Sequence, residues 1–228
     1  MTLKLYELEG TNNRRFSPFV WRIRMALAHK GLEFEPVSIR FTEKEKLSFS
    51  GQTKVPVLVD GDHVIYESWD IACYLEDNFP DTPSLFGGEV GRGQARFINQ
   101  WADHVQLPAM AKMLMPDVYD HLHPEDHVYF RTKWEKALGK PLEDVRDERD
   151  HFMEDFLHVL TPIRETLESQ PFLCGEHPAH GDYIVFGAFQ WARIISPYIL
   201  LDEDDNVFAW RKRMLSLFNN MANEAVGY

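Results

Sequence analysis

Three short stretches of the sequence combine residue types that can bind and activate a small molecule. The first is Ser17-Pro18, in which a hydroxyl precedes a proline at the predicted start of a helix. Ser17 is then the N-cap, and Pro18 lies in the first turn, where its missing N–H costs nothing. The hydroxyl is therefore at the positive end of a helix, which stabilises anions. Taken alone, the pattern also fits an ordinary helix cap.

The second stretch is Val55-Pro56, at the start of an apolar run that predicts a strand. Proline cannot donate a hydrogen bond to a sheet, so this position favours a cis peptide bond in a tight turn. The N–H and C=O of Val55 then remain free to pair with an extended peptide.

The third stretch is Glu67-Ser68, which places a carboxylate and a hydroxyl at the start of another predicted helix, with Ser68 as its N-cap. As for Ser17, ordinary helix capping is the alternative explanation of this pair. Read together, the two side chains can hold the ammonium and carboxylate ends of an amino acid, and Ser17 is the third corner of the same site.

Hydrophobic periodicity predicts two parts of different fold class, joined by the turn-rich segment 79–84. Residues 1–80 show the order β-α-β-α-β-β-α, with strands expected at 3–8, 34–39, 55–59 and 63–66 and a loosely helical segment at 42–49. Residues 90–228 show no strand pattern, and helices are expected at 94–115, 129–138, 150–167, 182–195 and 207–221.

Composition limits the partners. The formal net charge is −12, with 10 Lys and Arg against 12 Asp and Glu in residues 1–80 and 14 against 24 beyond them. A surface of this sign repels phosphate, so neither nucleic acid nor an anionic membrane is expected as a partner. The two cysteines have no metal-ligand spacing, and no signal peptide or spanning segment is predicted, which favours a cytoplasmic protein. No metal site is expected, because His121, His123 and His127 surround Pro124 without a matching carboxylate or cysteine set.

With these three stretches in this order, the chain resembles the glutathione transferase family over nearly its whole length. The resemblance implies a thioredoxin-like N-terminal domain, an all-helical second domain that contributes a hydrophobic pocket, a homodimer, and glutathione as co-substrate. It also implies that Val55, next to Pro56, pairs with the cysteinyl part of glutathione. Glu67 and Ser68 would bind its γ-glutamyl end, and Lys54 would reach a carboxylate.

Ser17 occupies the position at which thioredoxin-fold oxidoreductases carry a cysteine. A cysteine could form a mixed disulfide with glutathione and exchange it, whereas a serine cannot. A serine hydroxyl can instead donate a hydrogen bond to the glutathione sulfur and lower the pKa of its thiol from about 8.5. The resemblance therefore implies that Ser17 is the catalytic residue and that the attacking nucleophile is the glutathione thiolate.

Within the family, the likeness is greatest to the bacterial lignin β-etherases and their fungal relatives. It rests on residues 17–22, on Phe41-Thr42, on residues 67–69 and on the run at 138–145. This likeness implies that the thiolate displaces a phenol from the carbon bearing an aryl ether. Ala179 departs from the family pattern, because a serine or threonine usually caps the helix at that place.

Alternatives to ether cleavage remain. One is general conjugation or isomerisation of hydrophobic aromatic electrophiles, and the other is a transferase-like assembly module without thiol chemistry. For the substrate pocket we assign Phe16, Phe19, Met113 and Tyr119, although the last two fit a protein core at least as well.

Overall fold

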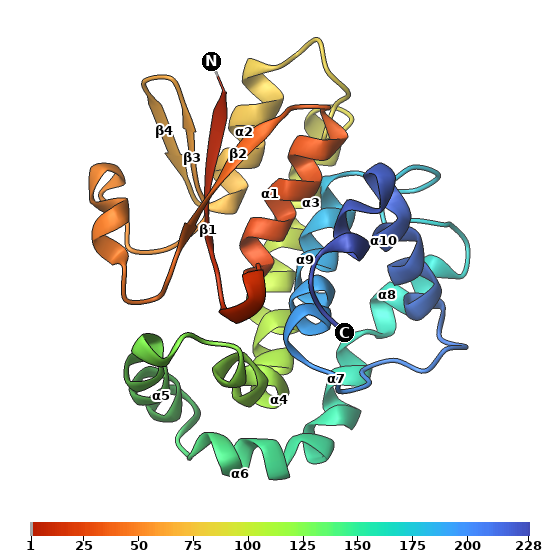
Figure 1. Cartoon of the computed structure of the whole chain (residues 1–228). Helices are drawn as coiled ribbons and strands as arrows, with labels where there is room; N and C mark the ends of the chain where they lie inside the picture. The colour runs from red at the N-terminus through yellow and green to blue at the C-terminus, as the bar shows by residue number, and fades with distance from the viewer. Residues whose placement is uncertain (1) are drawn as a thin grey trace.

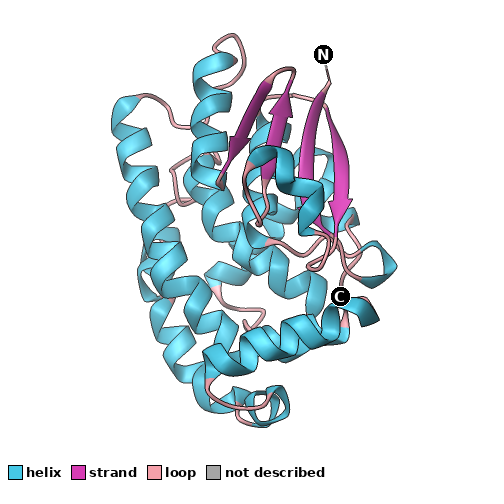
Figure 2. Cartoon of the chain, turned by 90° about the vertical axis from the view of Figure 1, so that its left-hand side faces the viewer, coloured by secondary structure: helices cyan, strands magenta, loops and turns pink. Residues whose placement is uncertain are grey.

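The computed structural model describes residues 2–228, and its N-terminal part is built on a four-stranded sheet (Figures 1 and 2). The strands are β1 (Leu3–Leu8), β2 (Phe34–Ile39), β3 (Val57–Asp60) and β4 (His63–Tyr66), in the order β2-β1-β3-β4. β1 and β2 are parallel, whereas β3 is antiparallel to both β1 and β4. A parallel pair needs a crossover, which α1 (Pro18–His29) supplies. This is the thioredoxin-like arrangement expected from the sequence.

The two faces of the sheet are covered differently. α1 and α2 (Ser68–Asn78) lie on one face, and the short 3-10 helix η2 (Lys44–Ser50) lies against the other (Figures 1 and 2). Leu47 of η2 packs with Ile39 and Val57 in a small core of its own. The loosely helical segment predicted here is thus a single 3-10 helix.

The rest of the chain is helical, as predicted. No helix of residues 2–228 combines the length and the apolar character needed to cross a bilayer. The helices are α3 (Glu89–Trp101), α4 (Leu107–Asp120), α5 (Pro124–Leu138), α6 (Leu142–Asp147), α7 (Met153–Val159), α8 (Thr161–Leu167), α9 (His180–Ile195) and α10 (Asn206–Glu224).

Two helices that the sequence predicted as continuous are interrupted. The helix predicted at 94–115 extends further at both ends, but a π-helical turn at 102–106 separates α3 from α4. The helix predicted at 150–167 breaks at Leu160 into α7 and α8, and Pro162 follows in the first turn of α8. Hydrophobic spacing does not reveal such breaks because the apolar face continues across them.

α9 is the central helix of the second part and positions the start of α1. Nearly all of its residues are buried, and it packs along α1 (Figure 1). Gly187 allows the close approach, because a Cβ there would lie 2.5 Å from the carbonyl oxygen of Pro18. The N-terminus of α1, which carries Ser17, is thereby fixed against the core.

The N-terminus of α9 lacks the usual capping side chain, as expected from Ala179. The neighbouring carboxylate of Asp182 compensates in part, since it accepts hydrogen bonds from the backbone N–H of Ala179 (3.2 Å) and of Leu173 (2.7 Å). It also accepts one from the indole N–H of Trp210 at 2.9 Å. The reciprocal bond of a capping box, which the backbone N–H of Asp182 would donate to the N-cap side chain, has no acceptor in alanine.

Ala179→Thr is expected to be more stable than Ala179→Val by about 1 kcal/mol, because only threonine supplies the missing hydroxyl acceptor. The two variants have nearly the same shape, so their difference isolates the cap. For a chain of this size the melting temperature should differ by about 2–4 °C. Equal melting temperatures in thermal unfolding would show that Asp182 already completes the cap.

Candidate active site

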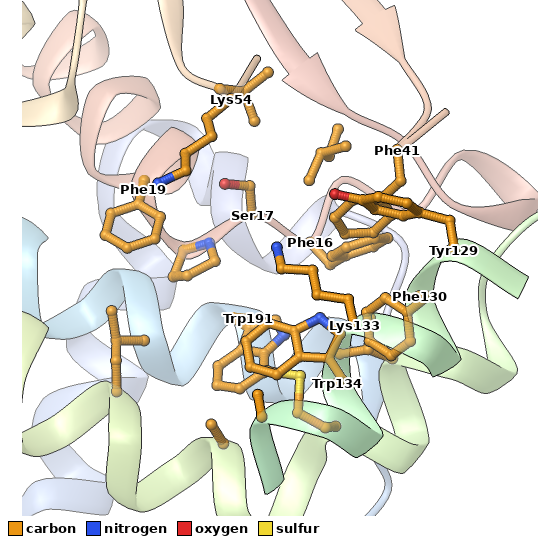
Figure 3. A pocket seen from close by; sticks show the side chains of 18 of the residues that line it. Phe16, Ser17, Phe19, Phe41, Lys54, Tyr129, Phe130, Lys133, Trp134 and Trp191 are labelled. Carbon is orange, nitrogen blue, oxygen red and sulfur yellow. The ribbon is translucent and has the colours of Figure 1, made fainter. Parts of the chain in front are cut away.

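A cavity of about 580 Å³ lies between the end of the sheet and helices α4 and α5 (Figure 3). The strand register explains why the predicted residues meet there. Tyr6, Val57 and Tyr66 form one row across β1, β3 and β4. Val55 therefore lies at the sheet edge where β1 ends and α2 begins. Of the predicted residues, those that line the cavity are Phe16, Ser17, Phe19, Lys54 and Val55.

Ser17 caps α1 and also faces the cavity. Its side chain is buried, with 4% of the residue exposed, and its Oγ accepts a hydrogen bond from the backbone N–H of Val20 at 3.4 Å. A hydroxyl has one proton to donate as well as lone pairs to accept, so the cap leaves the proton free. Figure 3 shows the Ser17 oxygen pointing into the cavity. The capping and binding readings of this residue are therefore compatible.

The Val55-Pro56 peptide bond is cis, and Pro56 is buried directly before β3. Over residues 2–228, neither the N–H nor the C=O of Val55 has a hydrogen-bond partner. Val55 is one of the residues that line the cavity. The arrangement can pair with one residue of an extended peptide, as the sequence predicted.

Glu67 and Ser68 directly follow β4 and are not among the residues that line the cavity. The sequence predicted Ser68 as the N-cap of α2, but Ser68 is the first helical residue and Glu67 holds the cap position. Glu67 has φ 62°, and a side chain in this left-handed region costs about 1–3 kcal/mol. Glu67 is exposed, so its side chain is open to solvent in this backbone conformation.

Two domain models from one family match the chain. The glutathione S-transferase N-terminal domain matches residues 16–78, and the C-terminal domain matches residues 94–212, more than half of the sequence. The chain belongs to the glutathione S-transferase family. Glutathione is the co-substrate of that family, and the motif at Ser17 lies inside the N-terminal match.

Individual transferases are similar over different lengths. The glutathione S-transferase-like protein ustS of Aspergillus flavus is 26% identical over 216 residues, which cover 81% of this chain and 76% of that protein. The probable glutathione S-transferase GSTU1 of Oryza sativa subsp. japonica is 39% identical over 100 residues, which span 42% of its length and 39% of this chain.

Solved transferase structures share the whole fold. CsGST63524 of Ceriporiopsis subvermispora, crystallised with glutathione, aligns with a TM-score of 0.82 at 21% identity, over 96% of this chain and 97% of its own. GSTFuA3 of Phanerochaete chrysosporium aligns with a TM-score of 0.79 at 25% identity, over 100% of this chain and 99% of its own.

Two of the residues assigned to the substrate pocket of this transferase do not line the cavity. Met113 is fully buried in the core. Tyr119 packs on His127, with ring centroids 4.4 Å apart. The cavity side of α4 is instead formed by residues spaced four apart, namely Leu107, Ala111 and Met115. This helical spacing was readable in the sequence, but it did not show which face of α4 meets the first part of the chain.

The sequence predicted Phe16 and Phe19 among the residues that form the aromatic wall of the cavity but missed the aromatic side chains that come from the segment after β2, from α5 and from α9. Phe41 follows β2, and its ring centroid lies 6.2 Å from that of Phe16 and 5.6 Å from that of Phe130 (Figure 3). The spacing of Phe130, Trp134 and Leu138 on α5 was the available signal. The sequence analysis also assigned no basic residue to the substrate pocket. The aromatic residues that line the cavity are Phe16, Phe19, Phe41, Tyr129, Phe130, Trp134 and Trp191.

Asp126 holds the Phe41 segment against α5. The carboxylate is fully buried and accepts hydrogen bonds from the backbone N–H of Phe41 (3.3 Å) and Thr42 (2.9 Å) and from the Thr42 hydroxyl (2.8 Å). Because Asp126 lies in the first turn of α5, it links this helix to the segment after β2, and both line the cavity. Its role in this transferase is to position the Phe41 ring.

Asp126→Asn is expected to raise the KM for an aromatic substrate several-fold while kcat changes little. An amide keeps the size of the side chain but places a donor against backbone N–H groups, so the Phe41 segment loosens. The unfolding free energy should fall by about 1 kcal/mol. Glu125→Gln is the matched control, since Glu125 is exposed and, within residues 2–228, its one ion pair is with Arg40 at 3.4 Å. Steady-state kinetics with an unchanged KM in Asp126→Asn would contradict this role.

Proposed function

We propose that this transferase activates the thiol of glutathione and directs the thiolate to a hydrophobic aromatic electrophile. One observation carries the proposal. The Ser17 hydroxyl points from a helix N-terminus into an aromatic cavity that Val55 also lines, and within residues 2–228 the peptide groups of Val55 have no hydrogen-bond partner. A cavity used only for core packing would have no need of these polar groups.

The residues around Ser17 fit the parts of glutathione. The N–H and C=O of Val55, beside Pro56, pair with the cysteinyl residue and so fix the position of its sulfur. The carboxylate of Glu67 and the hydroxyl of Ser68 bind the ammonium and carboxylate of the γ-glutamyl end. The side chain of Lys54, which lines the cavity, binds a carboxylate of the tripeptide.

Activation follows from hydrogen bonding to the charged form of the sulfur. Ser17 donates a hydrogen bond that is stronger to a thiolate than to a thiol, and the positive end of α1 adds to it. Each unit by which the pKa of the thiol falls below about 8.5 needs about 1.4 kcal/mol of preferential stabilisation. One charge-assisted hydrogen bond and the helix dipole supply one or two units.

The chemistry is a displacement at carbon. The sulfur donates its electron pair to the electrophilic carbon, a C–S bond forms, and the leaving group departs with the pair of the broken bond. In the finer form of the proposal this bond is the C–O bond of a β-aryl ether, and the departing phenolate takes a proton from water. The support is the sequence likeness, including the run at 138–145, in which Leu138 lines the cavity.

We also propose that two copies of the chain associate. Phe49 on η2 and Val90 and Phe97 on α3 are large apolar side chains with 50%, 77% and 74% of their surface exposed. Covering them in a homodimer would remove this apolar surface from water. Light scattering tests the association. A cytoplasmic location is proposed from the free thiols of Cys73 and Cys174.

Titration of the protein with glutathione across pH tests the proposal. Thiolate absorbance in the ultraviolet should appear below the pKa of free glutathione with the natural chain and require higher pH with Ser17→Ala. A chain that does not bind glutathione would favour the assembly-module reading. Binding with the same thiolate pKa in both proteins would mean that another group activates the sulfur.

A further inference from the structure

The cavity is basic although the chain is acidic. Five basic side chains line it, together with one carboxylate, Asp103, whereas the whole chain has a formal net charge of −12. A low-dielectric cleft lined by one sign of charge concentrates ligands of the opposite sign. The basic residues are Arg40, Lys44, Lys54, Lys112 and Lys133.

Some of these charges already have partners. Arg40 pairs with Glu43 at 3.1 Å, and Asp103 pairs at 2.8 Å with Arg22, whose guanidinium pKa is lowered by complete burial. Lys54 belongs to the proposed glutathione site. Over residues 2–228, the other three lysines of the cavity form no ion pair with a carboxylate. Positive charge therefore remains after glutathione is accounted for.

Lys133 and Tyr129 place this charge on the aromatic wall. They lie one turn apart on α5 and so project from the same face. Figure 3 shows the Lys133 ammonium inside the cavity beside Trp134, on the side toward Ser17. Its Nζ is 5.3 Å from the centre of the Trp134 ring. An ammonium at this position can reach a ligand that stacks on the wall.

Lys44 prepares Tyr129 to act as a second donor. The Lys44 Nζ donates a hydrogen bond to the Tyr129 hydroxyl oxygen at 2.8 Å. Since that oxygen accepts, the hydroxyl proton remains free to be donated. A positively charged neighbour makes the hydroxyl a better donor to an anion. The aromatic wall therefore carries two hydrogen-bond donors, the ammonium of Lys133 and the polarised hydroxyl of Tyr129.

We propose that the electrophilic substrate is an aromatic anion, whose ring packs against the wall while its carboxylate accepts hydrogen bonds from Lys133 and Tyr129. This inference rests on the proposed function and names the substrate class of the same site. A hydrogen bond to a charged group contributes more than a neutral one, and two donors fix the ring relative to the sulfur. A neutral aromatic compound would leave the Lys133 charge without a partner.

The test compares 4-(chloromethyl)benzoate with 4-(chloromethyl)benzamide, which have the same reacting carbon and nearly the same shape but differ in charge. With each, a C–S bond forms to glutathione, the C–Cl bond breaks, chloride leaves with the electron pair, and the thiol proton goes to solvent. The measured quantity is the ratio of kcat/KM for benzoate to that for benzamide, corrected for the uncatalysed reaction.

The natural chain is expected to prefer the benzoate, and Lys133→Met should lower the ratio about tenfold, equivalent to about 1.4 kcal/mol. Lys133→Glu should reverse the preference, and the natural preference should weaken as salt is added. Lys136→Met is the matched control, because Lys136 is an exposed lysine on the same helix that does not line the cavity. Its ratio should equal that of the natural chain.

Several outcomes would overturn the inference while leaving the proposed function intact. One is a benzoate-to-benzamide ratio of kcat/KM that is the same in Lys133→Met and in the natural chain. This includes the case in which the variant reacts more slowly with both substrates by the same factor, because Lys133 would then act on the thiolate. Another is a preference for the benzamide. If neither compound reacts, the glutathione titration decides the proposed function, and calorimetric titration with 2-naphthoate and 2-naphthamide decides the inference separately. Equal affinity of the protein for 2-naphthoate and 2-naphthamide would refute the inference.

Discussion

Replacing Ser17 with alanine is expected to lower kcat/KM for glutathione conjugation about a hundredfold at neutral pH, since removal of one positioned donor typically costs that much. The loss should appear in kcat rather than in the KM for glutathione, because in the proposed site the Val55 peptide and the Glu67-Ser68 pair would still bind the tripeptide. The pH profile of kcat should also shift to higher pH as the thiol pKa rises. Stopped-flow or steady-state assays over pH measure both effects.

Ser17→Thr and Ser17→Cys separate the roles of the hydroxyl. Threonine keeps the donor, so it should retain much more activity than alanine. Cysteine should lose conjugation and gain thiol–disulfide exchange, because its thiolate can form a mixed disulfide with glutathione. Mass spectrometry would detect that adduct as a covalent addition of glutathione. An alanine variant with the activity of the natural chain would refute the role of Ser17.

Loss of the cap must be distinguished from loss of the donor. The Ser17 Oγ accepts the Val20 N–H at 3.4 Å, which is long for a hydrogen bond. Its removal should cost about 1 kcal/mol or less of stability. Ser17→Asp supplies a cap without a donor at neutral pH, so it should be stable and inactive. Thermal unfolding of each variant provides the check.

The sequence predicted those parts of the fold and site that depend on local chemistry. Ser17-Pro18 favours a helix start through local chemistry alone, and Val55-Pro56 directly precedes a strand that the continuous apolar run predicts. The strand order and register of the structure bring both to the same end of the sheet. Family resemblance, rather than spacing alone, linked these residues to glutathione.

The remainder depended on packing between distant segments. Phe41 and Phe130 come together only because Asp126 ties the segment after β2 to the start of α5, across more than 80 residues of sequence. Nothing local distinguishes that buried aspartate from the exposed acidic residues near it. In the same way, α10 looks regular in sequence, yet residues 217–220 depart from helical geometry within it. Hydrophobic periodicity cannot detect either feature.

Burial of His180 is expected to make the folded protein lose stability as the pH falls below about 6.5. The imidazole is fully buried at the start of α9, and over residues 2–228 neither ring nitrogen has a hydrogen-bond partner. Its nearest ring neighbour is Phe86, at 5.3 Å between centroids. Burial, reinforced by the charge of Arg22, lowers the pKa of His180 to about 3.

The direction in which the unfolding free energy changes with pH follows from proton binding. Below about pH 6.5 the unfolded chain takes up a proton at this histidine, whereas the folded chain does not until about pH 3. Low pH therefore favours the unfolded state, and the unfolding free energy should fall by about 1.4 kcal/mol per pH unit, or about 2 kcal/mol by pH 5. The stabilising contribution is complete above pH 6.5 and is lost progressively as the pH approaches 3.

His180→Leu tests this dependence, since leucine is close in volume and cannot titrate. Urea unfolding of both proteins between pH 7.5 and 5 should give a slope that is smaller for the variant by about one proton. Part of the slope will remain, because burial also lowers the pKa of His29, which contacts the Tyr183 hydroxyl and the Ser84 carbonyl. Parallel curves for the two proteins would mean that His180 takes up its proton in the folded state as readily as in the unfolded chain.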